Sequence, residues 1–132
     1  MQVNTPISLG ELVDKITILE IKLVNISDPN KHHNVRNEHD LLKSTLEQVI
    51  GDSGVDRTVF ETFKAELKSI NETLWKIEDD IRECERDQDF SAKFVELARS
   101  VYFTNDKRAA TKNAMNLKFG SELVEEKSYE SY

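Results

Sequence analysis

Three polar side chains, Asn105, Arg108 and Lys112, interrupt a stripe that is otherwise apolar, and they are the best candidates for chemistry in this sequence. At 100° per residue they lie on one face of a predicted helix, and Met115 resumes the apolar pattern on that face. An arginine and a lysine placed in this way can bind a carboxylate or a phosphate through charged N–H donors. They also need a carboxylate partner, because an unpaired charge in a core is strongly destabilising.

Glu20 is the predicted partner of these cations. It lies near the middle of the apolar face of the first predicted helix and is the only carboxylate there. The layer then has three interpretations. The first is a structural ion pair that fixes the helix register. The second is a pocket in which Arg108 and Lys112 bind a small acidic ligand and Glu20 orients these two side chains. In the third, Arg108 and Lys112 extend to solvent at the end of a groove. We expect Arg108 to be the polar residue to which function is most sensitive.

No metal site and no cofactor is predicted. His32 and His39 share a helix face, but the motifs HExxH and HxxEH are absent, so these two residues and His33 are expected at the surface. Asp79 and Asp80 resemble the acidic helical sites that hold magnesium, yet the next helix offers few carboxylates to complete such a site. The sequence therefore favours a solvated acidic face.

Helices are the elements that must position these residues. Ser8 and Glu11 have the spacing of a capping box, and Asp28 followed by Pro29 is typical of a helix N-terminus. Gly51 is expected to end the second helix. The sequence predicts one domain, 1–132, with helices at about 9–27, 29–50, 57–87 and 91–119.

The third helix carries the clearest pattern in the chain. Its apolar residues alternate steps of three and four: Phe60, Phe63, Leu67, Ile70, Leu74, Ile77, Ile81 and Cys84. A helix of that length spans about 45 Å at 1.5 Å per residue, so it needs an equally long partner. Trp75 and Val59 add apolar surface at its edge, which favours a homodimer built on the hairpin of the third and fourth helices. The expected fold class is all-α, with antiparallel hairpins forming a bundle that dimerisation completes.

The charge distribution is uneven along the chain. Residues 91–120 hold six basic and two acidic groups, whereas residues 55–90 hold six basic and 11 acidic groups, so we expect the third helix to neutralise the fourth. The last residues, 121–132, are acidic and contain few apolar side chains, which favours a loosely held tail after a helix end at Gly120.

Composition narrows the classes of function. The 132 residues include 18 basic and 25 acidic side chains, a net charge of −7 that works against binding to nucleic acid or an anionic membrane. The single cysteine, Cys84, cannot form an intrachain disulfide and favours a reducing compartment, the cytoplasm. No stretch is apolar enough to predict a membrane span or a signal peptide.

Four segments carry a resemblance to a known family. They read VDKITILEIKL (13–23), NETLWKIEDDIRECE (71–85), FVELARSVYFTNDKRAATKNAMN (94–116) and GSELVEEKSY (120–129). In these the chain resembles a family of short helical bacterial and phage proteins described as a domain of unknown function. The resemblance implies a helical protein, sometimes in surface-sugar gene settings, in which the tail belongs to the pattern. It implies no catalytic residues.

Two functions follow as hypotheses. The first is an α-helical interaction or assembly module, whose partner is a second copy or another protein. The second is a small helical-bundle enzyme or binding protein for an acidic metabolite, similar in architecture alone to chorismate-mutase bundles. A cavity lined by Arg108, Lys112 and Glu20 would favour the ligand, and a fully paired polar layer would favour assembly.

Overall fold

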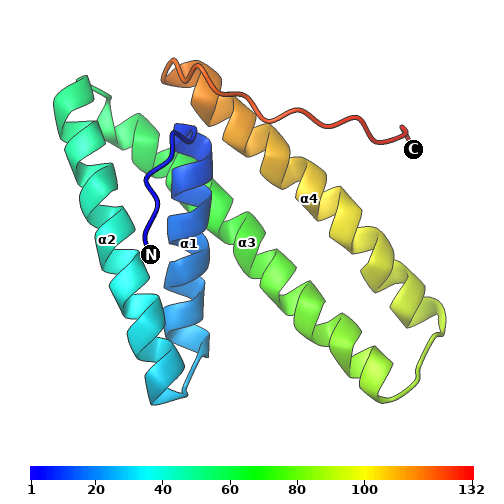
Figure 1. Cartoon of the computed structure of the whole chain (residues 1–132). Helices are drawn as coiled ribbons and strands as arrows, with labels where there is room; N and C mark the ends of the chain where they lie inside the picture. The colour runs from blue at the N-terminus through cyan, green and yellow to red at the C-terminus, as the bar shows by residue number, and fades with distance from the viewer.

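The computed structural model describes residues 1–132 and contains four α-helices and no β-strand. The helices are α1 (Leu9–Asn25), α2 (Pro29–Ser53), α3 (Arg57–Arg86) and α4 (Ala92–Lys118). Figure 1 shows them as two antiparallel hairpins, α1 with α2 and α3 with α4. The predicted all-α class and the four helices are confirmed. None of these helices is both long enough and apolar enough to cross a membrane.

The predicted starts of α1 and α2 are explained by side-chain caps. The Ser8 hydroxyl accepts a hydrogen bond from the backbone N–H of Glu11 at 3.1 Å, which is one half of a capping box. The Asp28 carboxylate accepts bonds from the first free N–H groups of α2, and Pro29 occupies the position where its missing N–H costs nothing. The Glu11 carboxylate instead faces α4.

The end of α2 differs from the prediction. The helix continues through Gly51 to Ser53 and ends at Gly54, whose φ of +67° is the left-handed conformation that glycine adopts freely. At the end of α4 the prediction is confirmed, because Gly120 has a φ of +69° directly after the terminal turn. The N–H of Ser121 then donates to the carbonyl of Asn116 at 2.9 Å and closes that turn.

Helix α1 lies at the centre of the fold and packs against each of the other three helices. Its buried residues therefore surround it instead of forming one stripe: Gly10, Leu12, Val13, Asp14, Ile16, Thr17, Leu19 and Ile21. Three of them join a core cluster with side chains from all other helices: Leu12, Val13, Ile16, Leu46, Ile50, Phe60, Leu67 and Met115. Burial of these apolar surfaces holds the two hairpins together.

Five residues of the predicted apolar seam of α3 are buried and three are half-buried: Phe60, Leu67, Leu74, Ile77 and Cys84 in the first group, Phe63, Ile70 and Ile81 in the second. On α2, however, Val49 is exposed although Leu46 and Ile50 beside it are buried. Helix α2 packs mainly on α1, so only a narrow stripe of it is covered.

The far half of the α3–α4 hairpin extends beyond α1 and α2 (Figure 1). There the two helices pack only against each other and the end of the tail, and several large apolar side chains stay exposed: Phe90, Val95, Tyr102 and Phe103. Val95, Tyr102 and Phe103 are seven and eight residues apart, so they share one face of α4.

The C-terminal tail has no regular secondary structure beyond residue 122 and runs back along α4, which it contacts through a few side chains (Figure 1). The amide of Asn113 donates to the backbone carbonyl of Glu125 at 3.2 Å. The hydroxyl of Tyr132 donates to Asp106, which raises the pKa of Tyr132 to about 12. Its ring also packs edge-on against Phe103, with 4.8 Å between centroids. An acidic tail is held here because α4 is the basic helix.

Gly10 allows α1 and α4 to approach closely. Its N–H donates to the Asn116 side-chain oxygen at 2.7 Å, and a Cβ atom at this position would lie 2.7 Å from the backbone oxygen of Lys112. That distance is shorter than any van der Waals contact, so a side chain would push the helices apart.

We therefore expect Gly10→Ala to lower the free energy of unfolding by about 2 kcal/mol in urea titrations, since overpacking of this kind costs roughly 1–3 kcal/mol. Gly51→Ala is the matched control, because Gly51 also lies in a helix but a Cβ atom there would have no other atom within 4 Å. That variant should be slightly more stable than the native chain. Equal effects of the two substitutions would contradict the close approach.

Candidate functional site

Asp14 on α1 is the centre of the polar layer. Only 1% of its surface is exposed, and its carboxylate accepts two hydrogen bonds from the guanidinium of Arg108, one from Nε to Oδ1 at 2.9 Å and one from Nη2 to Oδ2. This bidentate contact raises the pKa of Arg108 above its ordinary value. The predicted polar interruption of α4 is therefore real, and it faces α1.

A third helix joins the pair through Asn71 of α3. Its side-chain amide donates to Asp14 at 2.9 Å and to the hydroxyl of Thr17 at 3.0 Å. The Thr17 hydroxyl donates in turn to the backbone carbonyl of Asp14 at 2.8 Å. One buried carboxylate thus fixes α1 against both α3 and α4.

Lys112 occupies the next turn of α4, and only 8% of its side chain is exposed. Its Nζ lies 2.8 Å from the carboxylate of Glu125 in the tail, 3.1 Å from Glu11 and 3.8 Å from Asp14. Burial by itself would lower the pKa of Lys112, but the hydrogen bonds with Glu125 and Glu11 outweigh burial and raise it. Lys112 is therefore charged and paired.

Glu20 is not the partner of Arg108, and that prediction is wrong. Its carboxylate lies 3.0 Å from Lys64 and 3.2 Å from Lys68, both on α3. Burial would raise the pKa of Glu20, but the two lysines prevail and lower it. Six residues separate Glu20 from Asp14, which places it about 9 Å farther along α1 and on another side of that helix.

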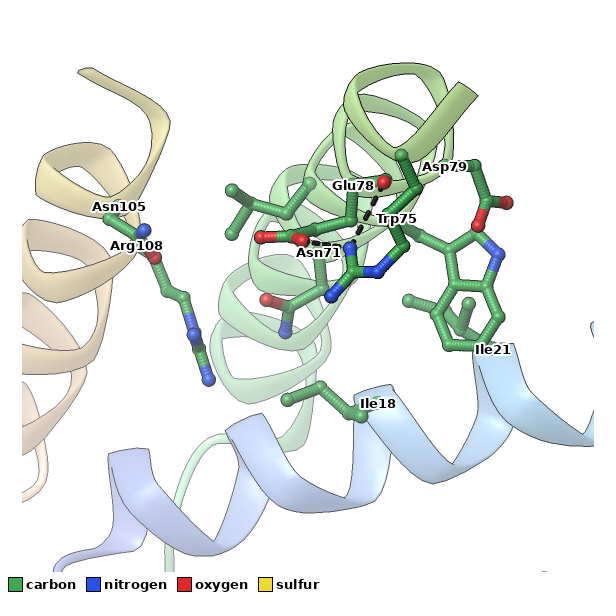
Figure 2. A pocket seen from close by; sticks show the side chains of 10 residues that line it. Ile18, Ile21, Asn71, Trp75, Glu78, Asp79, Asn105 and Arg108 are labelled. Carbon is green, nitrogen blue, oxygen red and sulfur yellow. Dashed lines mark hydrogen bonds and ion pairs between the residues drawn. The ribbon is translucent and has the colours of Figure 1, made fainter. Parts of the chain in front are cut away.

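Two cavities meet at Arg108 and Asn105. The larger, about 500 Å³, is a groove between α1, α3 and α4, and its lining includes Asn71 and Trp75. Figure 2 shows Arg108 and Asn71 reaching toward each other from α4 and α3, with the indole of Trp75 near Ile21. The smaller, about 240 Å³, is mostly polar and lined by seven residues: Glu11, Asn105, Arg108, Ala109, Lys112, Glu125 and Lys127.

His39 is buried, which corrects the expectation that all three histidines lie at the surface. Its Nδ1 lies 3.1 Å from Asp40, and its Nε2 lies 3.8 Å from Glu20. The histidine thus fills the α1–α2 interface next to the Glu20 cluster. No group of three or more His, Cys, Asp or Glu side chains is arranged to hold a metal ion.

Asp14 is the site residue that the sequence pattern failed to indicate. The apolar arc of α1 points to one buried face, whereas this helix is buried on several. A second stripe, formed by Gly10, Asp14 and Thr17 at helical spacing, carries small and polar residues to α3 and α4. That stripe was the available signal, since small residues allow the close approach that buried polar contacts need.

The fold and the site define an all-α protein whose central helix is tied to a long hairpin by a buried polar layer, in which Arg108 and Lys112 are paired with carboxylates. The chain belongs to DUF6165, a family of unknown function, whose model matches residues 1–132. No curated protein and no solved structure matches the chain.

A double-mutant cycle tests the central pair. Arg108→Met alone should lower the free energy of unfolding by about 3 kcal/mol, because it leaves the Asp14 charge buried with fewer partners. Arg108→Met together with Asp14→Leu should cost less than the sum of the two single substitutions, since both desolvation penalties are removed together, although Asn71 loses one acceptor. Urea titrations of the single and double variants give the coupling energy.

The control for this cycle pairs Arg108→Met with Glu20→Leu. These effects should add to within about 0.5 kcal/mol, because Glu20 belongs to a separate cluster. A coupling as large for Glu20 as for Asp14 would contradict the assignment.

The lowered pKa of Glu20 predicts a dependence of stability on pH. Its contribution is complete above the ordinary value of 4.5 and is lost as the pH falls through the lower value of the folded state. Glu20→Gln should therefore be destabilised at pH 7, and its difference from the native chain should shrink below about pH 4.5. Unfolding in urea at pH 7 to 3 measures this, with the exposed Glu122→Gln as control. A constant difference over that range would refute the prediction.

Proposed function

We propose that the protein is an α-helical interaction or assembly module that acts as a homodimer. The pairing of the polar layer is the observation that carries this proposal. Arg108 is engaged by Asp14, and Lys112 is engaged by Glu11 and Glu125, so the two candidate cations already have carboxylate partners within the chain. Such a layer fixes helix register and leaves binding to the outer surface.

The surface available to a partner lies on the far half of the α3–α4 hairpin. Val95, Tyr102 and Phe103 are exposed on one face of α4, in a region where α1 and α2 do not cover the hairpin. Exposed apolar side chains gathered on one face are typical of interaction sites.

Charge complementarity favours a second copy as the occupant. Without Arg108 and Lys112, which are paired within the chain, residues 91–120 carry an excess of two basic groups, and residues 55–90 carry an excess of five acidic groups. A two-fold arrangement of hairpins brings α4 of each copy against α3 of the other, so the same complementary contact forms twice.

Light scattering at tens of micromolar protein tests this proposal. The native chain should have twice the mass of one chain, and Val95→Asp should reduce that mass by half, because it buries a charge in the interface. Val24→Asp is the matched control, since Val24 is exposed near the end of α1 and should leave the dimer intact. A monomeric native chain would overturn the proposal.

The second candidate is a binding protein or small helical-bundle enzyme for an acidic metabolite, and the resemblance links its family with surface-sugar genes. The polar cavity of about 240 Å³ favours it, because Arg108, Lys112 and Lys127 all contribute to the lining. The carboxylate of Glu125 already lies next to Lys112 in this cavity. Glu20 lies outside this cavity and takes no part in this candidate.

A further inference from the structure

We propose that Glu125 fills a carboxylate-binding site on α4 and that a small monocarboxylate ligand displaces it, lifting this part of the tail. The inference rests on the second candidate function and adds to it the class of ligand and the way in which access is controlled.

Glu125 is the exchangeable partner of Lys112. The other carboxylates near Lys112 Nζ belong to Glu11 and Asp14, which are fixed in α1. Glu125 comes from a segment without regular secondary structure, yet it makes the shortest of the three contacts, 2.8 Å. An intermolecular carboxylate can replace this group without any movement of a helix.

The charges around the site specify a monoanion. Arg108 is paired with Asp14, Lys127 lies 4.0 Å from Asp106, and Lys112 is shared by Glu11 and Glu125. Removal of Glu125 therefore takes the closest carboxylate away from a largely buried ammonium group. A ligand with a single carboxylate restores the balance, whereas a dianion would leave an uncompensated negative charge in a partly desolvated place.

The space beside Glu125 limits the size of the ligand. About 240 Å³ is open there, below the 300–1,000 Å³ that is typical of pockets for drug-sized molecules. A short carboxylic acid of a few heavy atoms therefore fits, with Asn105 in the lining as an additional hydrogen-bonding group.

Tethering makes Glu125 a strong competitor. A group on a short flexible link has an effective concentration in the millimolar range, so a free ligand must exceed it before the tail lifts. The anchor at the end of the tail is separate, since Tyr132 binds Asp106 and packs on Phe103. Loss of the Glu125 contact can therefore open the site while the tail end stays attached.

Propionate binding to the full chain tests the inference. Chemical shifts of the α4 amides are followed by NMR as sodium propionate is added at constant ionic strength, with sodium chloride as the blank. Glu125→Gln should bind propionate at least tenfold more tightly than the native chain. Glu126→Gln is the matched control, because the neighbouring Glu126 is exposed, and it should bind like the native chain.

Further variants separate the possible outcomes. Adding Lys112→Met to Glu125→Gln should abolish the gain, and adding Lys127→Met should reduce it even if Lys112→Met fails to fold. If the native chain, Glu125→Gln and Glu126→Gln bind propionate equally and the binding depends on Lys112, displacement of Glu125 is refuted. The protein would then still bind a carboxylate, as the second candidate function requires. Absence of binding in all three would overturn both.

Discussion

The buried carboxylate of Asp14 is the constraint on which the packing of three helices depends. A carboxylate without water needs several donors, and Asp14 takes them from Arg108 on α4 and Asn71 on α3. These donors reach it only at one relative position of the helices. Apolar burial drives the helices together, but apolar contacts tolerate small sliding motions, whereas this pair does not. Asp14 therefore sets the register that the hydrophobic core alone would leave loose.

The same constraint divides the molecule into two unlike ends. Near Asp14 and Lys112, four segments meet: α1, α3, α4 and the tail. Beyond α1, the hairpin consists of α3 and α4 with the end of the tail on Tyr102 and Phe103, and several large apolar side chains are exposed there. The two proposals fall on these two ends, since the ligand belongs to the crowded end and the second copy belongs to the exposed one.

The sequence predicted the helices well because capping residues and helical periodicity are local signals. It also predicted the polar interruption at Arg108 and Lys112, since a break in an apolar stripe is visible in one helix alone. The partners were not predictable in this way. The apolar face of α1 pointed to Glu20 as the partner of Arg108. The role of Asp14 depends on the central position of α1, which no pattern within one helix indicates. Likewise, α4 was expected to be neutralised by α3, yet its buried cations are paired by α1 and the tail.

The pairing of Asp14 with Arg108 joins residues that are 94 positions apart in the chain, and the bond between Gly10 and Asn116 spans 106 positions. During synthesis, α1 therefore leaves the ribosome long before the groups that neutralise it exist. Until α4 has emerged, burial of α1 would enclose the Asp14 carboxylate without Arg108, so the core must assemble late. These bonds join residues far apart in the chain, and such non-local contacts slow folding. The tail follows α4 and also completes the pairing of Lys112, so this pairing forms only after α4 has been made.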